Sequence, residues 1–342
     1  MLRPLAQDEL DEVVARARGD LQELRGARVL VTGATGFFGA WLLATLLRAD
    51  DELGLDLHVT ALARDPSPAL ARFAERGRAR FESRAADVRS FAPRPDDRWT
   101  HVIHAATAAS ARLNEADPRE MFDVALRGTE RILEVAGEHG ATRVLLTSSG
   151  AIYGRQALDV THVEETCARG PDPLDPRSAY AEGKRGAELL SALATQRGLP
   201  VAIARCFAFV GPLLPLDAHF AIGNFLRDGL AGGPIVVEGD GTPLRSYMYA
   251  TELVVWLLAI LIRGEPARAY NVGSQHARSI SEVAARVAAH FGTRVERRQA
   301  PVEGAAPERY VPSTARARAE LGLEELVSLD EAIARTVRHH RS

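Results

Sequence analysis

The stretch VLVTGATGFFG, residues 29–39, constrains the fold of this chain more than any other. An apolar segment leads into a turn with three glycines, and an apolar helical segment begins directly behind them. The first glycine permits the tight turn, the second lets a pyrophosphate approach the backbone, and the third lets helix and strand pack closely. The amino terminus of the helix would then hold the phosphates. The residues expected to contact a dinucleotide here are Gly33, Thr35, Gly36, Phe37, Phe38 and Gly39.

Short apolar segments, predicted as strands, alternate with helical segments up to residue 210. Continuous apolar strands of this kind are typical of a parallel sheet that helices cover on both faces. The predicted strands are ARVLVTG, LHVTALAR, HVIHAAT, TRVLLTSS and LPVAIARCF. The pattern therefore predicts an α/β protein with a Rossmann-type, doubly wound parallel sheet.

The chain divides into three predicted parts. Residues 1–26 show the spacing of one amphipathic helix that packs outside the sheet. Residues 27–210 form the dinucleotide-binding domain. Proline, glycine and irregular polar stretches mark residues 211–342 as mainly a smaller substrate-binding lobe, with segments that can return to the sheet. The apolar run at 253–262 is too short to span a membrane and is predicted to be a buried helix.

Charge and cysteine content exclude several classes of protein. A formal net charge of −3 gives no reason to expect nucleic acid or a membrane surface as partner. Cys167 and Cys206 are the two cysteines, and there is no CxxC motif or cluster of histidines. We therefore expect no disulfide framework and no metal site, and a reducing location, the cytoplasm.

The segment RSAYAEGKR suggests the chemistry, because it places Tyr180 and Lys184 four residues apart on one helix face. The pKa of a free tyrosine, near 10, is too high for a base at neutral pH. A nearby ammonium group and a positive nicotinamide ring would lower it. Of the 42 basic residues only Lys184 is a lysine. A compact ammonium can hold both a phenolate and the nicotinamide ribose, whereas a planar guanidinium cannot easily do both.

The G-x-x-G-x-x-G spacing and the Tyr-Lys pair resemble the extended short-chain dehydrogenase/reductases, a family that acts mainly on nucleotide sugars. The resemblance covers residues 27–340 and implies a catalytic unit of Ser149, Tyr180 and Lys184. Ser149 is preferred to Ser148 because it lies four residues before Tyr153. The resemblance also implies a nucleotide-diphosphate sugar as substrate and a homodimer through two surface helices, 119–138 and the helix that carries Tyr180.

The choice between NAD and NADP stays open, because Arg64 follows Ala63 where an aspartate would hold the adenosine ribose. Arg64 would suit the 2′-phosphate of NADP, but it could also stack on adenine, and Asp65 could supply the carboxylate. The other cofactor contacts that the resemblance implies are Asp87, Val88, Ala105, Ala106, Thr107, Ser148 and Lys184.

The segment SSGAIYG limits the reaction that follows oxidation of the sugar C4 hydroxyl. Sugar 4,6-dehydratases of this family carry an Asp-Glu pair where Gly150 and Ala151 stand here, so dehydration is not expected. The details resemble UDP-glucuronate decarboxylases more closely, although Ala151 replaces the glutamate of that subgroup. Residues that this resemblance assigns to the substrate are Ser149, His219, Asn224, Val236, Arg245 and Arg309.

The sequence therefore predicts an atypical UDP-glucuronate decarboxylase. The carboxyl group is beta to the C4 ketone, so carbon dioxide can leave without a dedicated base. Proton delivery to C5 would be impaired, and the product would be UDP-xylose, a leaked UDP-4-keto pentose, or both. A 4-epimerase and an NADPH-dependent 4-ketoreductase remain alternatives. A cofactor-sensing regulator of the same fold is a fourth, although such proteins commonly lose the Tyr-Lys pair that is present here.

Overall fold

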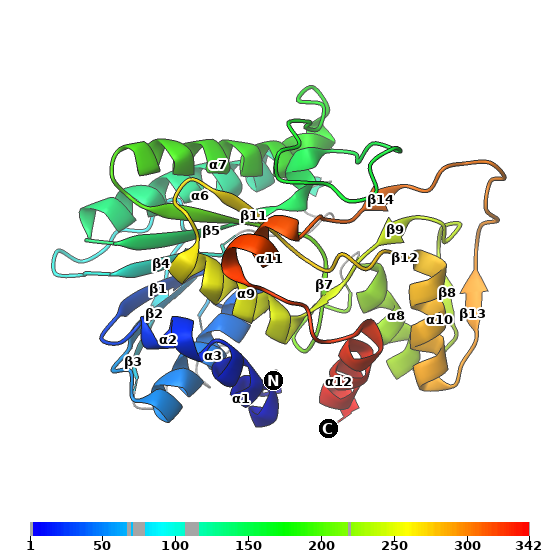
Figure 1. Ribbon diagram of the computed structural model, residues 1–342, viewed down its shortest axis with the longest axis horizontal. Helices are drawn as coiled ribbons and strands as arrows, with labels where there is room; N and C mark the ends of the chain where they lie inside the picture. Colours follow the sequence, from blue (N-terminus) through cyan, green and yellow to red (C-terminus); the bar gives the residue numbers. More distant parts are fainter. Residues whose placement is uncertain (1–2, 67–69, 71–78, 107–115, 218–219, 342) are drawn as a thin grey trace.

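A parallel sheet forms the centre of the protein. The computed structural model describes residues 3–66, 70, 79–106, 116–217 and 220–341 (Figure 1). Within these residues, seven parallel strands are ordered β11-β6-β5-β4-β1-β2-β3. Their bounds are β1 (Arg28–Thr32), β2 (His58–Ala63), β3 (Arg80–Ala85), β4 (His101–His104), β5 (Arg143–Ser149), β6 (Val201–Cys206) and β11 (Ala269–Val272). The five strands predicted from the sequence are all present.

Two strands escaped prediction for different reasons. β3 lies at the edge of the sheet and is mostly half-buried or exposed, so it lacks a continuous apolar run. β11 lies far along the chain, beyond residue 211, and pairs in parallel with β6. Its position shows that the second half of the chain completes the sheet that the first half begins.

Helices cover both faces of the sheet (Figure 1). In β1, Val29 and Val31 join one apolar core while Leu30 between them joins the other, as the alternation of side chains along a strand requires. The helices against the first core are α1 (Gln7–Arg16), α2 (Arg18–Gln22), α3 (Phe37–Leu53), α9 (Ala250–Arg263) and α11 (Ala315–Leu321). Those against the second are α6 (Pro118–Glu138) and α7 (Ala179–Gln196).

The amino-terminal segment forms two helices, where the sequence predicted one. The break falls at Ala17, whose φ of −94° and ψ of 11° lie outside the helical range. Val13, Val14 and Leu21 are fully buried in the first core. The segment therefore packs outside the sheet as expected, against α3 and α9.

The second lobe has its own apolar core, to the right in Figure 1. Its elements are β7 (Phe209–Val210), α8 (Ala221–Leu230), β8 (Ile235–Val237), β9 (Leu244–Arg245), β10 (Met248–Tyr249), β12 (Arg278–Ser279), α10 (Ile280–Phe291), β13 (Val295–Arg297), β14 (Arg309–Tyr310) and α12 (Leu329–Arg341). Of these elements, β7 comes directly after the sheet strand β6 in the chain, and it pairs in parallel with β10. The sequence-based boundary at residue 210 stays a prediction.

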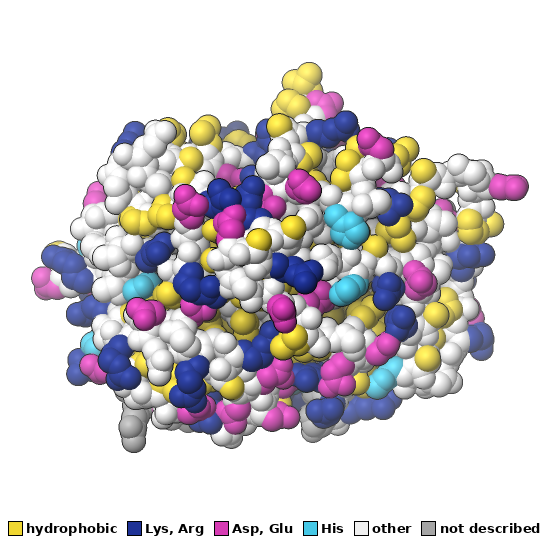
Figure 2. All heavy atoms as spheres, in the orientation of Figure 1, with side chains coloured by type: hydrophobic (Ala, Val, Ile, Leu, Met, Phe, Trp, Pro, Cys, Tyr) yellow, Lys and Arg dark blue, Asp and Glu magenta, His cyan; other side chains and the backbone are white. Residues whose placement is uncertain are grey.

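The apolar run at 253–262 lies inside α9, where Leu253–Leu261 are buried, so the predicted buried helix is confirmed. Among the residues described, no helix combines the length and apolar character needed to cross a bilayer. Acidic and basic side chains are interspersed over the face that Figure 2 displays. This mixture agrees with the small net charge.

Candidate active site

A cavity of about 1070 Å³ opens at the carboxyl ends of the strands, between the sheet and the second lobe. Ligands of open α/β sheets bind at this edge, because loops from neighbouring strands converge there. Predicted site residues that line the cavity are Gly33, Gly36, Phe37, Phe38, Gly39, Ala105, Ser148, Ser149, Tyr180, Lys184, Asn224, Val236 and Arg245. One space thus collects residues that lie more than 200 positions apart in the sequence.

The glycine turn has the shape that a pyrophosphate requires. Gly33 has a φ of +68°, and a Cβ atom there would lie 2.5 Å from the carbonyl oxygen of Ala105. A Cβ atom on Gly36 would meet only the Gly33 carbonyl oxygen, at 3.3 Å, and Gly36 lines the cavity. The helix α3 begins at Phe37, so its free N–H groups can receive phosphate oxygens. The residues present therefore fit a dinucleotide.

The same helix also touches the second lobe. The Phe38 ring packs edge-on against Phe209, with 5.2 Å between ring centroids. The indole N–H of buried Trp41 donates to the carbonyl oxygen of Pro212 at 2.9 Å. Aromatic side chains of α3 thus form a wall between the glycine turn and the start of the second lobe.

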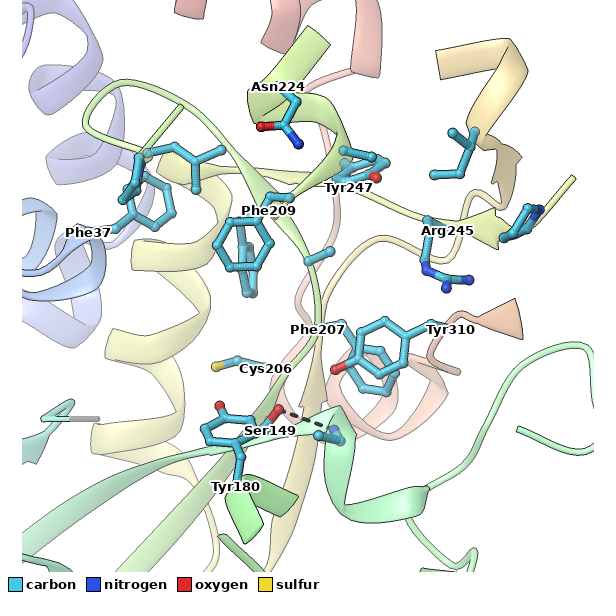
Figure 3. A pocket seen from close by; sticks show the side chains of 18 of the residues that line it. Phe37, Ser149, Tyr180, Cys206, Phe207, Phe209, Asn224, Arg245, Tyr247 and Tyr310 are labelled. Atoms are coloured by element: carbon cyan, nitrogen blue, oxygen red, sulfur yellow. Dashed lines mark hydrogen bonds between the residues drawn. The ribbon is translucent and has the colours of Figure 1, made fainter. Parts of the chain in front are cut away.

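The three candidate catalytic residues all line the cavity, and Figure 3 shows Ser149 and Tyr180 side by side on the sheet side of it. Ser149 is the last residue of β5, and its hydroxyl accepts the N–H of Ala151 at 3.1 Å in the 3-10 turn η1 (Gly150–Tyr153). Tyr180 lies in the first turn of α7, and its hydroxyl lies beside that of Ser149 in Figure 3. Burial raises the pKa of Tyr180 to about 12, and the Ser149 hydrogen bond lowers it in part.

Burial of the phenol has the largest effect on the pKa of Tyr180, whereas the lowering expected from the sequence also required the charge of a nicotinamide ring. Lys184, one turn later on α7, is 3% exposed and donates from Nζ to the Thr147 carbonyl oxygen at 2.6 Å. Burial lowers the pKa of Lys184 to about 8, and the charges of Cys206 and Glu188 oppose this. The residue is therefore held at the site by the end of β5.

Ser148 and Ser149 divide their roles by the alternation of strand side chains. The Ser148 hydroxyl donates to Glu188 Oε1 at 2.5 Å. Glu188 is in turn paired with Arg205 at 2.8 Å, and both side chains are nearly buried. Figure 3 shows Ser149 beside Tyr180, and the choice of Ser149 as the catalytic serine stays a prediction.

Several predicted cofactor contacts lie away from the cavity wall. Thr35, Arg64, Asp87, Val88 and Ala106 do not line the cavity. Arg64 is exposed at the end of β2. The Asp87 carboxylate accepts from Arg89 Nε at 2.9 Å and Nη2 at 2.7 Å, and this hydrogen bonding lowers the pKa of Asp87. Thr107 and His219 lie outside the described residues.

At the last predicted substrate position, the neighbouring residue lines the cavity instead of the predicted one. Arg309 does not line the cavity, but its neighbour Tyr310 does. Successive side chains of a strand point to opposite sides, so β14 can present only one of the two. Tyr310 pairs in register with Arg245 of β9, and Figure 3 shows both side chains at the cavity. Sequence reasoning missed Tyr310, and its adjacency to Arg309 was the available signal.

Further cavity residues carried no recognisable motif. Cys206 pairs in register with Ser149 on the neighbouring strand β6, and both Cys206 and the next residue, Phe207, line the cavity. Burial raises the pKa of the Cys206 thiol to about 12. Charged lining residues from the second lobe are Arg227, Asp228, Glu238, Asp240 and Arg298. Among the described residues, no group of three or more histidine, cysteine, aspartate or glutamate side chains could hold a metal ion.

Comparison with known proteins decides the family. A sequence model of the NAD dependent epimerase/dehydratase family matches residues 29–273, which is more than half of the chain. The chain belongs to this family. The matched segment includes the glycine turn, Ser149, Tyr180 and Lys184, so the family resemblance inferred from these motifs is confirmed.

Relatives and solved structures agree with the membership. A UDP-glucuronic acid decarboxylase 1 of Arabidopsis thaliana is 30% identical over 319 residues, covering 92% of this chain and 70% of its own length. DesIV, a dTDP-glucose 4,6-dehydratase from Streptomyces venezuelae solved with NAD and TYD, is 25% identical with a TM-score of 0.77, covering 92% of this chain and 97% of its own. MoeE5 in complex with UDP-glucuronic acid and NAD is 26% identical with a TM-score of 0.74, covering 92% and 99%.

The family and its relatives establish the broad class. The protein is an NAD-dependent enzyme of the nucleotide-sugar-modifying family, with the Rossmann-type α/β fold that the sequence predicted. The roles of the individual site residues remain predictions, and the geometry shows which of these residues line the cavity.

Proposed function

We propose that this enzyme decarboxylates UDP-glucuronate after oxidising its C4 hydroxyl. The observation that carries the proposal is the meeting of Ser149, Tyr180 and Lys184 in a cavity that also contains the glycine turn. The relatives named UDP-glucuronic acid decarboxylase cover 90% or more of the chain, and MoeE5 was solved with UDP-glucuronic acid. These likenesses favour UDP-glucuronate among nucleotide sugars.

Each catalytic residue has a distinct task in the proposed reaction. Tyr180 accepts the proton of the sugar O4 hydroxyl, and Ser149 orients that oxygen by sharing its hydrogen bond. NAD held at the glycine turn would supply an acceptor for the C4 hydride and a positive charge that favours the phenolate. Lys184, held at Thr147, adds a second positive charge that favours the phenolate. Arg245, which lines the cavity, is placed to pair with diphosphate oxygens.

The turn η1 favours decarboxylation over dehydration. Elimination of water requires an acid and a base, and neither Gly150 nor Ala151 carries either group. Loss of carbon dioxide from a β-keto acid needs no base, since the ketone accepts the electron pair. Decarboxylation is therefore compatible with the residues present, and UDP-xylose, UDP-4-keto pentose or both are the proposed products.

The test is to incubate the purified enzyme and NAD with UDP-glucuronate, and to measure carbon dioxide and product mass. Release of carbon dioxide with a pentose product supports the proposal. Isomer formation without a change of mass would identify a 4-epimerase instead. Consumption of one NADPH for each keto sugar would identify a ketoreductase. If the fully reduced pentose is the sole product, the predicted leak of keto pentose is wrong.

We also infer a homodimer through α6 and α7 and a cytoplasmic location. On α7, Leu189 is 63% exposed and Leu193 is 40% exposed, an apolar pair that a partner would cover. Cys167 and Cys206 are both free thiols, which agrees with a reducing compartment.

A further inference from the structure

Two aromatic rings occupy the space beside Gly150, where related dehydratases carry a carboxylate. A Cβ atom on Gly150 would lie 2.7 Å from the Phe207 ring and 2.8 Å from the Tyr310 hydroxyl oxygen. The two rings pack together, with 4.7 Å between centroids. A side chain at position 150 is therefore excluded, and a phenol hydroxyl stands in its place.

Ser149 lies between this phenol and the candidate catalytic tyrosine, Tyr180. Its hydroxyl has one proton to donate and two lone pairs to accept. The Ala151 N–H takes one lone pair at 3.1 Å, which leaves the proton and one lone pair of Ser149 for the Tyr180 and Tyr310 hydroxyls at the same cavity. Figure 3 shows the Ser149 hydroxyl between those of the two tyrosines.

Ionisation of Tyr180 fixes the direction of the hydrogen bonds that Ser149 can make to the two phenols. A phenolate can only accept, so Ser149 must donate its single proton to Tyr180. The remaining lone pair of Ser149 then accepts from Tyr310, which must itself be protonated. The three hydroxyls would then form a chain along which a proton can move from Tyr180 through Ser149 to Tyr310, or in the reverse direction.

The surroundings of Tyr310 suit an acid that gives up its proton only when a strong base is present. Burial raises the pKa of Tyr310 above its usual range, so the phenol stays protonated at neutral pH. The neighbouring Arg245 guanidinium lowers that pKa in part, and its charge would stabilise the phenolate that remains after proton transfer. An enolate carbon is basic enough to take such a proton.

We propose that Tyr310 is a second catalytic acid, which protonates C5 of the sugar after carbon dioxide has left. The proposal rests on the decarboxylase function inferred above. It supplies the proton donor that Gly150 and Ala151 lack, from a residue about 160 positions further along the chain.

The proton balance closes within the three hydroxyls. Oxidation moves the C4 hydride to NAD and the O4 proton to Tyr180. The C5–C6 bond then breaks, carbon dioxide leaves, and the electron pair forms an enolate over C5, C4 and O4. Tyr310 gives its proton to C5, and the proton on Tyr180 replaces it through Ser149. The products are the UDP-4-keto pentose, carbon dioxide and NADH, and later reduction to UDP-xylose takes one further proton from solvent.

The experiment compares wild-type enzyme with Tyr310→Phe, using UDP-glucuronate and NAD in deuterium oxide. The wild type should place one deuterium at C5 in a single configuration, which proton NMR of the pentose resolves. Tyr310→Phe keeps the ring contact with Phe207 but removes the acid. It should form pentose about 100-fold more slowly, the smaller end of the range for a general acid, with deuterium in both configurations. Reduction of NAD should stay within about twofold of wild type, since Tyr180 is intact.

The matched control is Tyr270→Phe, which removes the hydroxyl of a buried tyrosine outside the cavity. That hydroxyl accepts the Glu265 N–H at 3.2 Å, so the change should leave rate and deuterium configuration as in wild type. Tyr310→His supplies a different proton donor at the same position, and partial recovery of a single configuration is expected. It also serves as the test variant if Tyr310→Phe does not fold.

The outcomes separate the two proposals. A wild-type enzyme that releases no carbon dioxide from UDP-glucuronate overturns the decarboxylase function, and the role of Tyr310 with it. A wild type that decarboxylates, beside a Tyr310→Phe enzyme with unchanged rate and a single deuterium configuration, overturns the role of Tyr310 alone. A variant that loses NAD reduction to the same degree as pentose formation would assign Tyr310 to positioning Ser149 and would also overturn the proposal.

Discussion

Lys184 is buried beside the candidate catalytic tyrosine, and its protonation should be visible in the stability of the protein. Burial lowers its pKa from 10.5 to about 8, so between these values the unfolded chain holds a proton that the folded chain has lost. The free energy of unfolding from this group therefore rises with pH across that window and is constant below it.

The comparison with Lys184→Met isolates this effect, because other titrating groups are common to both proteins. We expect the stability of wild type relative to Lys184→Met to increase by about 1 kcal/mol between about pH 8 and 9. Urea unfolding at a series of pH values measures it. A difference that stays constant up to about pH 10 would mean that Lys184 titrates as an exposed lysine does.

Gly150 should not tolerate even a methyl group. A Cβ atom there meets the rings of Phe207 and Tyr310 below 3 Å, so Gly150→Ala should lower the free energy of unfolding by about 1–3 kcal/mol. Gly137 in α6 has no atom within 4 Å of the corresponding position. Gly137→Ala should therefore raise the free energy of unfolding by about 0.5–1 kcal/mol. Urea unfolding of both variants tests the two predictions. If Gly150→Ala raised the free energy of unfolding as much as Gly137→Ala does, the rings of Phe207 and Tyr310 would have to move aside at no cost.

The candidate site was predictable where its residues are local in sequence. Ser149, Tyr180 and Lys184 follow from short motifs, since a helix turn brings positions four apart together. Tyr310 could not be found this way, because its place depends on the pairing of β14 with β9, some 65 residues earlier. The register of that pairing decides whether Arg309 or Tyr310 faces the cavity.

At the scale of elements, α1 is bound to the rest of the protein by buried charges. Arg16 donates to both oxygens of Glu252 in α9, at 2.6 and 2.9 Å, and the Glu252 side chain is fully buried. The same carboxylate accepts the N–H groups of Leu326 and Val327 at 3.2 Å. Glu252 thus joins the amino-terminal helix to the segment before α12.

Removing one partner of this buried pair should be costly. Arg16→Met leaves the Glu252 carboxylate without its counter-ion, and the free energy of unfolding should fall by about 3–5 kcal/mol. The control is Arg18→Ala, which breaks a more exposed pair with Glu52 and should change stability by about 0–1 kcal/mol. Thermal and urea unfolding measure both. Similar small losses in the two variants would show that α1 contributes little to the fold.

Strands and helices could be predicted from the sequence where their apolar pattern is strong. They could not where their place in the fold, such as the edge of the sheet, weakens that pattern. The five central strands and α9 are apolar enough to be recognised from sequence. The edge strand β3 is only partly covered, so selection for apolar residues is weak there. The break at Ala17 lies between two helices that share one apolar face, which the periodicity alone cannot reveal.

For the whole molecule, the central prediction is the dimer. The helices α6 and α7 lie side by side (Figure 1). Leu189 and Leu193 of α7 are exposed. We expect a homodimer in light scattering coupled to size-exclusion chromatography. Leu189→Glu should produce monomers, because burying a charge without a partner in such an interface is unfavourable.

The control for the dimer is Leu326→Glu, which alters an exposed leucine on another part of the chain. It should leave the dimer intact. A wild-type protein that elutes as a monomer, or a dimer that survives Leu189→Glu, would exclude this surface as the interface.

The aromatic wall of α3 has a consequence for how such an enzyme can diversify. Phe38 and Trp41 belong to the cofactor helix, yet they contact Phe209 and the Pro212 carbonyl of the second lobe. A substitution within residues 209–212 that admits a new sugar would also shift α3, and with it the glycine turn expected to hold the pyrophosphate. New specificities are therefore easier to reach through other cavity residues of the second lobe, such as Glu238 and Asp240, to which no catalytic role is assigned.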